Sequence, residues 1–164
     1  MQFFISQIPF DETAIKRRMT ETNEETTARS GLILTPEQIT ELCGIYKREL
    51  LENKIVEFNA GGVVKIQKTF AESDFVDTSN YFEVIEAMTE AFYFLKREVN
   101  KEVRDDTVIN AMFEAFDRKC MGSIELFQSR ELEVLIRYIN EGRSSLEIVG
   151  DDDYDSKPEV PIFN

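Results

Sequence analysis

The chain has 164 residues, and its 32 acidic side chains against 19 basic ones give a net charge of −13. It contains no histidine, which excludes a histidine general base, a Ser-His or Cys-His nucleophile pair and a histidine-ligated metal site. The negative charge argues against binding to nucleic acid and to acidic membranes, because both repel an acidic surface. Catalysis by carboxylates, Lys, Tyr or Cys stays open but has no motif behind it, so we assign no catalytic residue, and we expect no cofactor, no metal site and no nucleic-acid or membrane partner.

The first 30 residues are predicted to form an N-terminal arm and linker. Residues 1–10 are apolar and favour a short strand or a packed arm, and they lack the basic region that begins a signal peptide. The next twenty residues are polar and rich in threonine, with Ile15 and Met19 as the weak apolar stripe of a helix that would start near Asp11. Residues 21–29 carry no such stripe and are predicted to be linker.

Residues 31–142 are predicted to form one helical domain of about five helices. Thr35 and Gln38 make a capping box, and Pro36 between them takes the first helical position. Each later helix shows apolar residues at helical spacing. The predicted helices span residues 35–53, 62–71, 80–104, 106–118 and 129–141. The fold class is therefore mainly α, with minor β structure expected only at the two ends of the chain.

The stretch at residues 80–104 is expected to be a long central helix around which the others pack. Its apolar stripe runs through Ile85, Met88, Phe92, Leu95, Val99 and Val103. Asn80 is expected to cap its start together with Glu83, and its acidic first half and basic second half complement the helix dipole. Further aromatic side chains widen the apolar face, namely Phe82, Tyr93 and Phe94. We therefore expect this helix to contact neighbours on more than one side.

Residues 116–132 resemble the helix–loop–helix of an EF-hand but lack its calcium ligands. Asp117 takes the first loop position, whereas Lys119, Met121 and Gln128 stand at the third, fifth and twelfth. Calcium requires oxygen ligands at the third and fifth positions and a bidentate glutamate at the twelfth. We therefore expect a capped corner between two helices, and no calcium binding.

Residues 143–164 are predicted to form an acidic C-terminal tail. Leu146 and Ile148 alternate as in a short strand. The tail then carries the acidic residues Asp151, Asp152 and Asp153 and the apolar residues Val160, Ile162 and Phe163. A segment of this kind docks by adding a strand to a sheet or by filling a groove. Whether the two ends of the chain pair with each other stays open.

Two cysteines and the lack of a long apolar run bear on the location of the protein. Cys43 and Cys120 are too few for a disulfide framework or a zinc site, which favours buried thiols in a reducing cytoplasm. No apolar run approaches 18 residues, so no segment is expected to span a membrane. A cytoplasmic location is the expectation.

Two functional hypotheses remain open. The favoured one is a non-enzymatic interaction or structural protein that binds another protein or forms a homodimer, because an apolar face too wide for one chain to bury serves as an interface. Its candidate interaction residues are Tyr93, Phe94, Asp151, Asp152, Asp153, Val160, Ile162 and Phe163. The alternative is a small-molecule binder or enzyme with an aromatic pocket beside the central helix.

Four stretches together resemble a bacterial family of small acidic helical proteins of unknown function. They read GLILTPEQITELC, IVEFNAGGVVKIQKTFAESDFVD, NYFEVIEAMTEAFYFLKRE and MFEAFDRKCMGSIEL, and the resemblance covers residues 31–140. It implies a cytoplasmic bacterial protein with one domain. The family has no established activity, so the resemblance supplies no site residue.

Overall fold

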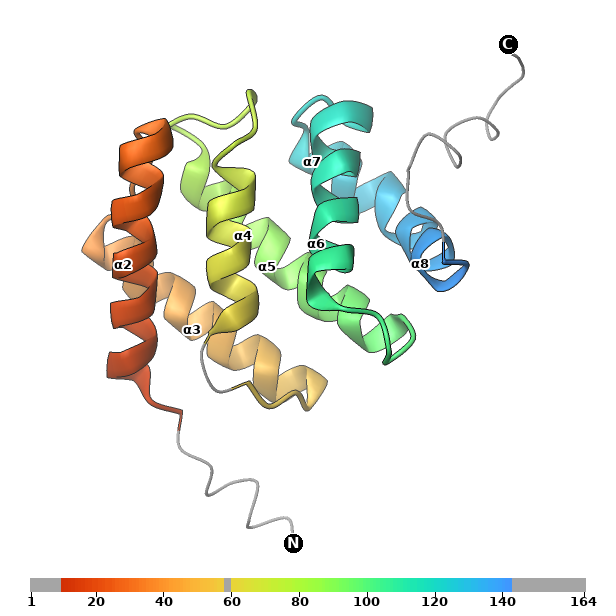
Figure 1. Ribbon diagram of the computed structural model, residues 1–164, viewed down its shortest axis with the longest axis horizontal. Coiled ribbons are helices and arrows are strands. Elements are labelled where there is room, and N and C mark those ends of the chain that lie inside the picture. Colours follow the sequence, from red (N-terminus) through yellow and green to blue (C-terminus); the bar gives the residue numbers. More distant parts are fainter. Residues whose placement is uncertain (1–9, 58–59, 143–164) are drawn as a thin grey trace, which may run out of the picture.

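The computed structural model describes residues 10–57 and 60–142, and regular structure in these ranges is entirely helical (Figure 1). The first four helices are α2 (Glu12–Ser30), α3 (Pro36–Asn53), α4 (Gly61–Phe70) and α5 (Tyr81–Glu98). Helix α6 (Asp105–Glu114) continues into a π-helical turn at Ala115–Lys119. The last helix comprises α7 (Ile124–Leu126), a second π-helical turn (Phe127–Glu131) and α8 (Leu132–Asn140). The strands expected at the two chain ends fall on residues 1–9 and 143–164, outside the described residues.

The helices form two layers. Helices α2, α4 and α6 stand side by side in front, and α3, α5 and α8 cross behind them (Figure 1). Helix α5 contacts α3, α4, α6 and α8, whereas α2 contacts α3 and α4. This is the packing expected when each helix has one apolar stripe to bury against a neighbouring layer.

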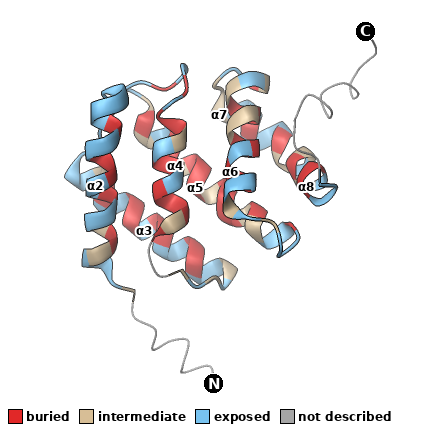
Figure 2. Ribbon diagram, viewed as in Figure 1, coloured by how far each residue is buried: buried red, intermediate tan, exposed pale blue. Residues whose placement is uncertain are grey.

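The core lies between the two layers, on the faces coloured as buried in Figure 2. Its largest fully buried side chains include Tyr46, Phe70, Phe92, Phe116 and Phe127. Two T-shaped ring pairs join α4 to α6 and the π-helical turn after it, through Phe70 with Phe113 and Phe70 with Phe116, each with centroids 5.6 Å apart. Since aromatic side chains bury large apolar areas, these rings supply much of the apolar area that is removed from water on folding.

The predicted linker at residues 21–29 is wrong, because α2 is a continuous helix to Ser30. Ile15 and Met19 belong to the common core, so α2 is part of the folded body. Its second half is held by buried polar residues, Thr22, Asn23 and Thr26, rather than by apolar ones. Apolar residues at helical spacing therefore do not mark this half of the helix in the sequence.

Helix α5 ends at Glu98 rather than at Arg104, which corrects the predicted length of the central helix. Val99 is extended, and the next residue, Asn100, donates its backbone N–H to Asn140 Oδ1 at 2.8 Å. With 18 residues α5 equals α3 and is shorter than α2 with 19, so one long central helix is not confirmed. The apolar stripe continues past the helix because Val99 is buried and Val103 packs against the core from the loop.

Both predicted termini near residues 80 and 129 differ in detail from the structure. Asn80 does not cap the first turn of α5; its Oδ1 accepts a hydrogen bond from the N–H of Asp77 at 2.8 Å. The last helix begins at Ile124, and its cap is Ser123, whose Oγ accepts from Leu126 N–H at 3.1 Å. In the corner before it, Asp117 Oδ1 accepts a hydrogen bond from Ser73 Oγ at 2.7 Å.

We expect Gly62→Ala to lower the free energy of unfolding by about 1–3 kcal/mol, the usual range for overpacking a core. A Cβ atom at Gly62 would lie 2.6 Å from Phe92 Cε2 and 2.7 Å from the Tyr93 hydroxyl. Gly61 is the matched control, because a Cβ there meets nothing within 4 Å. Urea unfolding of both variants would measure the difference. Equal stability of the two variants would contradict the close packing at Gly62.

Candidate functional site: a groove beside helices α2 and α3

The predicted interaction residues on α5 lie in or against the core. Tyr93 is fully buried, and Phe94 is half-buried with the Arg97 guanidinium 5.3 Å from its ring centroid. Asp151, Asp152, Asp153, Val160, Ile162 and Phe163 lie outside the described residues. Tyr93 therefore supplies no surface to a partner in this conformation.

Tyr93 instead belongs to a buried polar cluster with Tyr46 and Glu57. Both tyrosine hydroxyls donate to Glu57 Oε1, each at 2.8 Å. Burial, followed by the negative charge of Glu57, raises the pKa of Tyr46 and of Tyr93 well above the ordinary value. The shared carboxylate satisfies two hydroxyls inside the core and connects α3 and α5 to the residues that precede α4.

The aromatic side chains beside α5 fill the core rather than lining a cavity. Tyr81, Phe92 and Tyr93 are at most 1% exposed. Four pockets in the described part of the chain are lined by other residues. The most apolar of them lies elsewhere, along α2.

That pocket is an open groove of about 720 Å³ between α2, the segment after it and the first turns of α3. Its lining residues are Lys16, Thr20, Asn23, Glu24, Thr27, Ala28, Ile33, Leu34, Pro36, Ile39 and Thr40. The α2 residues recur every three or four positions, so they form one face of the helix. The exposed lining surface is mostly apolar: the α2 wall combines threonine and alanine with Lys16, Asn23 and Glu24, and the other wall carries larger aliphatic side chains.

The segment between α2 and α3 is fixed by hydrogen bonds from buried side chains. Asn23 Nδ2 donates to Leu34 O at 2.9 Å, and Asn23 Oδ1 accepts from Leu34 N–H at 3.0 Å. Thr26 Oγ1 donates to Leu32 O at 2.7 Å. As a result Leu32 and Leu34 point inward, at 4% and 2% exposure, and Ile33 between them is 56% exposed over the groove. The structure thus presents a large aliphatic side chain to solvent on a constrained backbone.

The end of α2 and the start of α3 also fix the segment that connects them. Gly31 ends α2 with φ of 74°, a left-handed conformation that glycine adopts at little cost. The predicted capping box at the start of α3 is confirmed, since Thr35 Oγ1 accepts from Gln38 N–H and Gln38 Oε1 accepts from Thr35 N–H, both at 3.0 Å. These caps place Pro36 and Ile39 in the groove wall.

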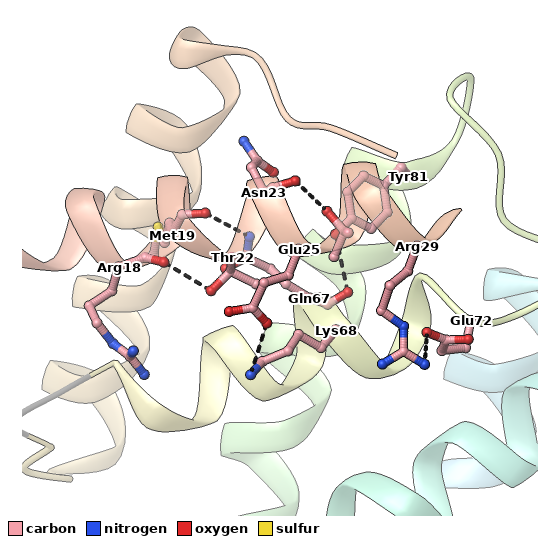
Figure 3. A network of polar contacts seen from close by, with 11 residues as sticks. Arg18, Met19, Thr22, Asn23, Glu25, Arg29, Gln67, Lys68, Glu72 and Tyr81 are labelled. Atoms are coloured by element: carbon pink, nitrogen blue, oxygen red, sulfur yellow. Dashed lines mark hydrogen bonds and ion pairs between the residues drawn. The ribbon is translucent and has the colours of Figure 1, made fainter. Parts of the chain in front are cut away.

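Helix α2 is anchored to α4 on the side away from the groove (Figure 3). Gln67 Nε2 donates to Met19 O at 3.3 Å, and the Tyr81 hydroxyl donates to Gln67 O at 3.1 Å. The ion pairs Lys68–Glu25 and Arg29–Glu72, at 3.4 and 3.1 Å, flank these bonds. The α2 wall of the groove is therefore supported from behind by specific contacts.

The groove has almost no net charge although the protein is strongly acidic. Its only charged lining residues are Lys16 and Glu24, and Lys16 Nζ is 3.0 Å from Glu12 Oε2. No cysteine, serine or tyrosine lines it. The arrangement suits the burial of an apolar surface and lacks an activated nucleophile.

Two further observations limit the chemistry of the described residues. Among them no group of three or more Cys, Asp or Glu side chains is arranged to hold a metal ion, and no helix is long and apolar enough to cross a membrane. Cys43 and Cys120 are buried, and burial raises the pKa of both thiols, that of Cys120 to about 11. Both thiols are therefore protonated at neutral pH, which leaves them poor nucleophiles.

The sequence interpretation missed this groove because half of its α2 wall was predicted to be linker. Three signals mark the helix in retrospect. Asp11 caps α2 by accepting from Ala14 N–H at 3.1 Å, and Gly31 stands directly after its last residue. Thr22, Asn23 and Thr26 recur at helical spacing as small polar residues, which a buried interface accepts when each finds a partner.

Comparison with known proteins adds a family without adding an activity. The model of a family of unknown function matches residues 18–145, a range that begins within α2 and ends just after α8. The predicted resemblance to a family of unknown function is thereby confirmed. No curated protein and no solved structure matches the chain.

Proposed function

Because the chain belongs to DUF6323, a family of unknown function, its function has to be inferred from its surface, and we propose that it is a non-enzymatic protein-interaction module. The groove beside α2 and α3 binds an amphipathic helix of a partner protein. The observation that supports this proposal is Ile33, 56% exposed on a segment held by buried hydrogen bonds, at the edge of an apolar groove.

The shape of the groove favours a helix as its occupant. It lies along a face of α2 on which Thr20, Glu24 and Thr27 are exposed, and an added helix there would pack against both α2 and the start of α3. Partner helices of this kind insert apolar side chains at positions i, i+3 or i+4, and i+7. Burying the 56% of Ile33 that is exposed would contribute about 0.8–1.7 kcal/mol, a large share for one side chain.

The charge of the protein favours a basic partner over a second copy of the same chain. Each chain carries a net charge of −13, so two copies repel one another unless their interface is large. The groove itself is nearly neutral, and therefore tolerates an apolar stripe from any source. We infer that the partner helix has an apolar stripe flanked by Lys or Arg, which would speed association with the acidic body.

A displayed library of helical peptides, selected against the full-length protein, tests this proposal. We expect the enriched peptides to share an apolar stripe at helical spacing with basic flanks. Ile33→Glu is expected to weaken their binding at least tenfold, because it removes the apolar contact and places a charge in the groove.

Leu51→Glu is the matched control for that experiment. Leu51 is also a large exposed aliphatic residue, 69% accessible, but it lies on α3 outside the groove lining. It should leave binding unchanged within about twofold. Equal loss in both variants, or no loss in Ile33→Glu, would contradict the groove as the binding site. A dimer that Ile33→Glu dissociates would show a second copy as the occupant and overturn the choice of partner.

A further inference from the structure

A second pocket differs from the apolar groove because it gathers positive charge on this acidic protein. It has a volume of about 440 Å³ and lies where α3 and α5 end. Its lining contains four basic residues, Lys54, Lys96, Arg97 and Lys101, and no acidic one. The remaining lining is made of asparagine side chains and aliphatic residues, among them Asn53, Ile55 and Val99.

Two of the four cations have no carboxylate partner in the described part of the chain. Lys96 Nζ is 3.1 Å from Asp105 Oδ1, and Arg97 Nε is 3.2 Å from Glu98 Oε2. Lys54 and Lys101 are both exposed, and neither forms an ion pair with a described residue. The carbonyl ends of α3 and α5 favour cations here, which accounts for part of the clustering. A pocket with two uncompensated ammonium groups is still the natural docking point for a carboxylate-rich segment.

The last described helix ends beside this pocket. Helix α8 ends against the loop after α5, where Asn140 Oδ1 accepts from Asn100 N–H at 2.8 Å and Asn140 Nδ2 donates to Glu98 O at 3.4 Å. Asn100 and the adjacent Lys101 line the cationic pocket. Asp151 follows Gly142 by nine positions in the sequence, a length that reaches up to about 30 Å when extended.

We propose that this cationic pocket binds the acidic run of the same chain, Asp151–Asp153 with Asp155. The tether places these carboxylates at an effective concentration in the millimolar range, which favours an intramolecular contact over a free anion or a second chain. The contact is electrostatic and is therefore weakened by salt, whose screening length falls to about 3 Å at 1 M. It would hold the acidic run at the end of the molecule where α3 and α5 finish, away from the neutral groove on α2.

Zero-length carboxyl-to-amine cross-linking of the full-length protein tests this inference. An equal mixture of isotope-labelled and unlabelled chains is cross-linked at low concentration, and the linked peptides are mapped by mass spectrometry. We expect links from the acidic run to Lys54 or Lys101 within single chains, at least fivefold more frequent than links to Lys47 or Lys68. Both comparison lysines are exposed on other surfaces, and 1 M salt should abolish the preference.

A second readout uses the full chain with Asp151, Asp152, Asp153 and Asp155 all changed to Asn. Acetylation of Lys54 and Lys101 by a limiting amine reagent should become at least twofold faster in this variant, while Lys68, paired with Glu25, should not change. Unchanged reactivity of Lys54 and Lys101, or links spread evenly over the exposed lysines, would overturn the proposal. Links found only between labelled and unlabelled chains would overturn it in favour of a second copy.

Discussion

Asn23→Ala is expected to lower the free energy of unfolding by about 3 kcal/mol. The Asn23 side chain is 3% exposed and makes both hydrogen bonds to the backbone of Leu34, which is itself 2% exposed. Its removal leaves a buried N–H and a buried carbonyl without a partner, and each such group costs about 1–3 kcal/mol. Since the chain lacks tryptophan, urea unfolding followed by far-ultraviolet circular dichroism is the suitable measurement.

The matched control is Thr20→Ala on the same helix. Thr20 is exposed, and its hydroxyl bonds only the carbonyl of Lys16 one turn earlier. Its substitution should change stability by no more than about 0.5 kcal/mol, as is usual at exposed positions. A small loss in Asn23→Ala would mean that the segment before α3 does not depend on Asn23, and the constrained position of Ile33 would then need another cause.

Raising the pH from 10 to 11 is expected to remove about 3 kcal/mol of stability. Burial raises the pKa of Tyr81 to about 12, and burial together with Glu57 raises the pKa of Tyr46 and Tyr93. In the unfolded chain all three phenols titrate near pH 10. Half of each phenol is already ionised in the unfolded chain at pH 10, so each contributes about 1 kcal/mol between pH 10 and 11.

Stability falls as the pH rises because the folded and unfolded states bind different numbers of protons. Between pH 10 and the folded-state pKa, the folded protein keeps three protons that the unfolded chain releases, so rising pH favours unfolding. The stability is fully present below pH 10 and is lost as the pH passes through the folded-state values. For Cys120, whose pKa is raised to about 11, the same argument applies from about pH 8.5–9.

Circular dichroism and tyrosinate absorbance, recorded together across pH 9–12.5, check this prediction. We expect the absorbance of the buried tyrosines to change in the same cooperative transition as the helical signal. Tyr81→Phe should make the loss of stability between pH 10 and 11 smaller by about 1 kcal/mol, whatever its effect at pH 7. Independent titration of all tyrosines near pH 10, with helical structure intact, would contradict the buried positions of these phenols.

The sequence by itself determined the class of the fold and most of its helices. Apolar residues at helical spacing placed α3, α4 and α5 correctly at their starts, because burial of one stripe is a local property of a helix. The capping box of Thr35 and Gln38 was predicted for the same reason, since both partners lie within one turn.

The tertiary structure alone decided where the helices end and which residues face outward. Helix α5 stops at Glu98 although its stripe continues to Val103, because the loop after it is held by Asn140 from a helix 40 residues away. The aromatic width of α5 predicted an interface, but Tyr81, Phe92 and Tyr93 are buried and contact α3 and α4. Burial depends on contacts distant in sequence, which spacing along one helix cannot reveal.

The candidate groove also depends on features that the sequence pattern does not show. Asn23 and Thr26 look like linker residues in the sequence because they are polar. They stabilise the fold through hydrogen bonds to Leu34 and Leu32, which a reversal of the chain brings beside them. Ile33 stands between two leucines, and the sequence does not show that both leucines are buried while Ile33 is exposed. Composition and periodicity determined that this acidic chain folds as packed helices. Only the hydrogen bonds from Asn23 and Thr26 to the backbone of the next segment decided that an apolar groove lies beside α2, since a polar side chain stabilises a buried position only when a partner is brought to it.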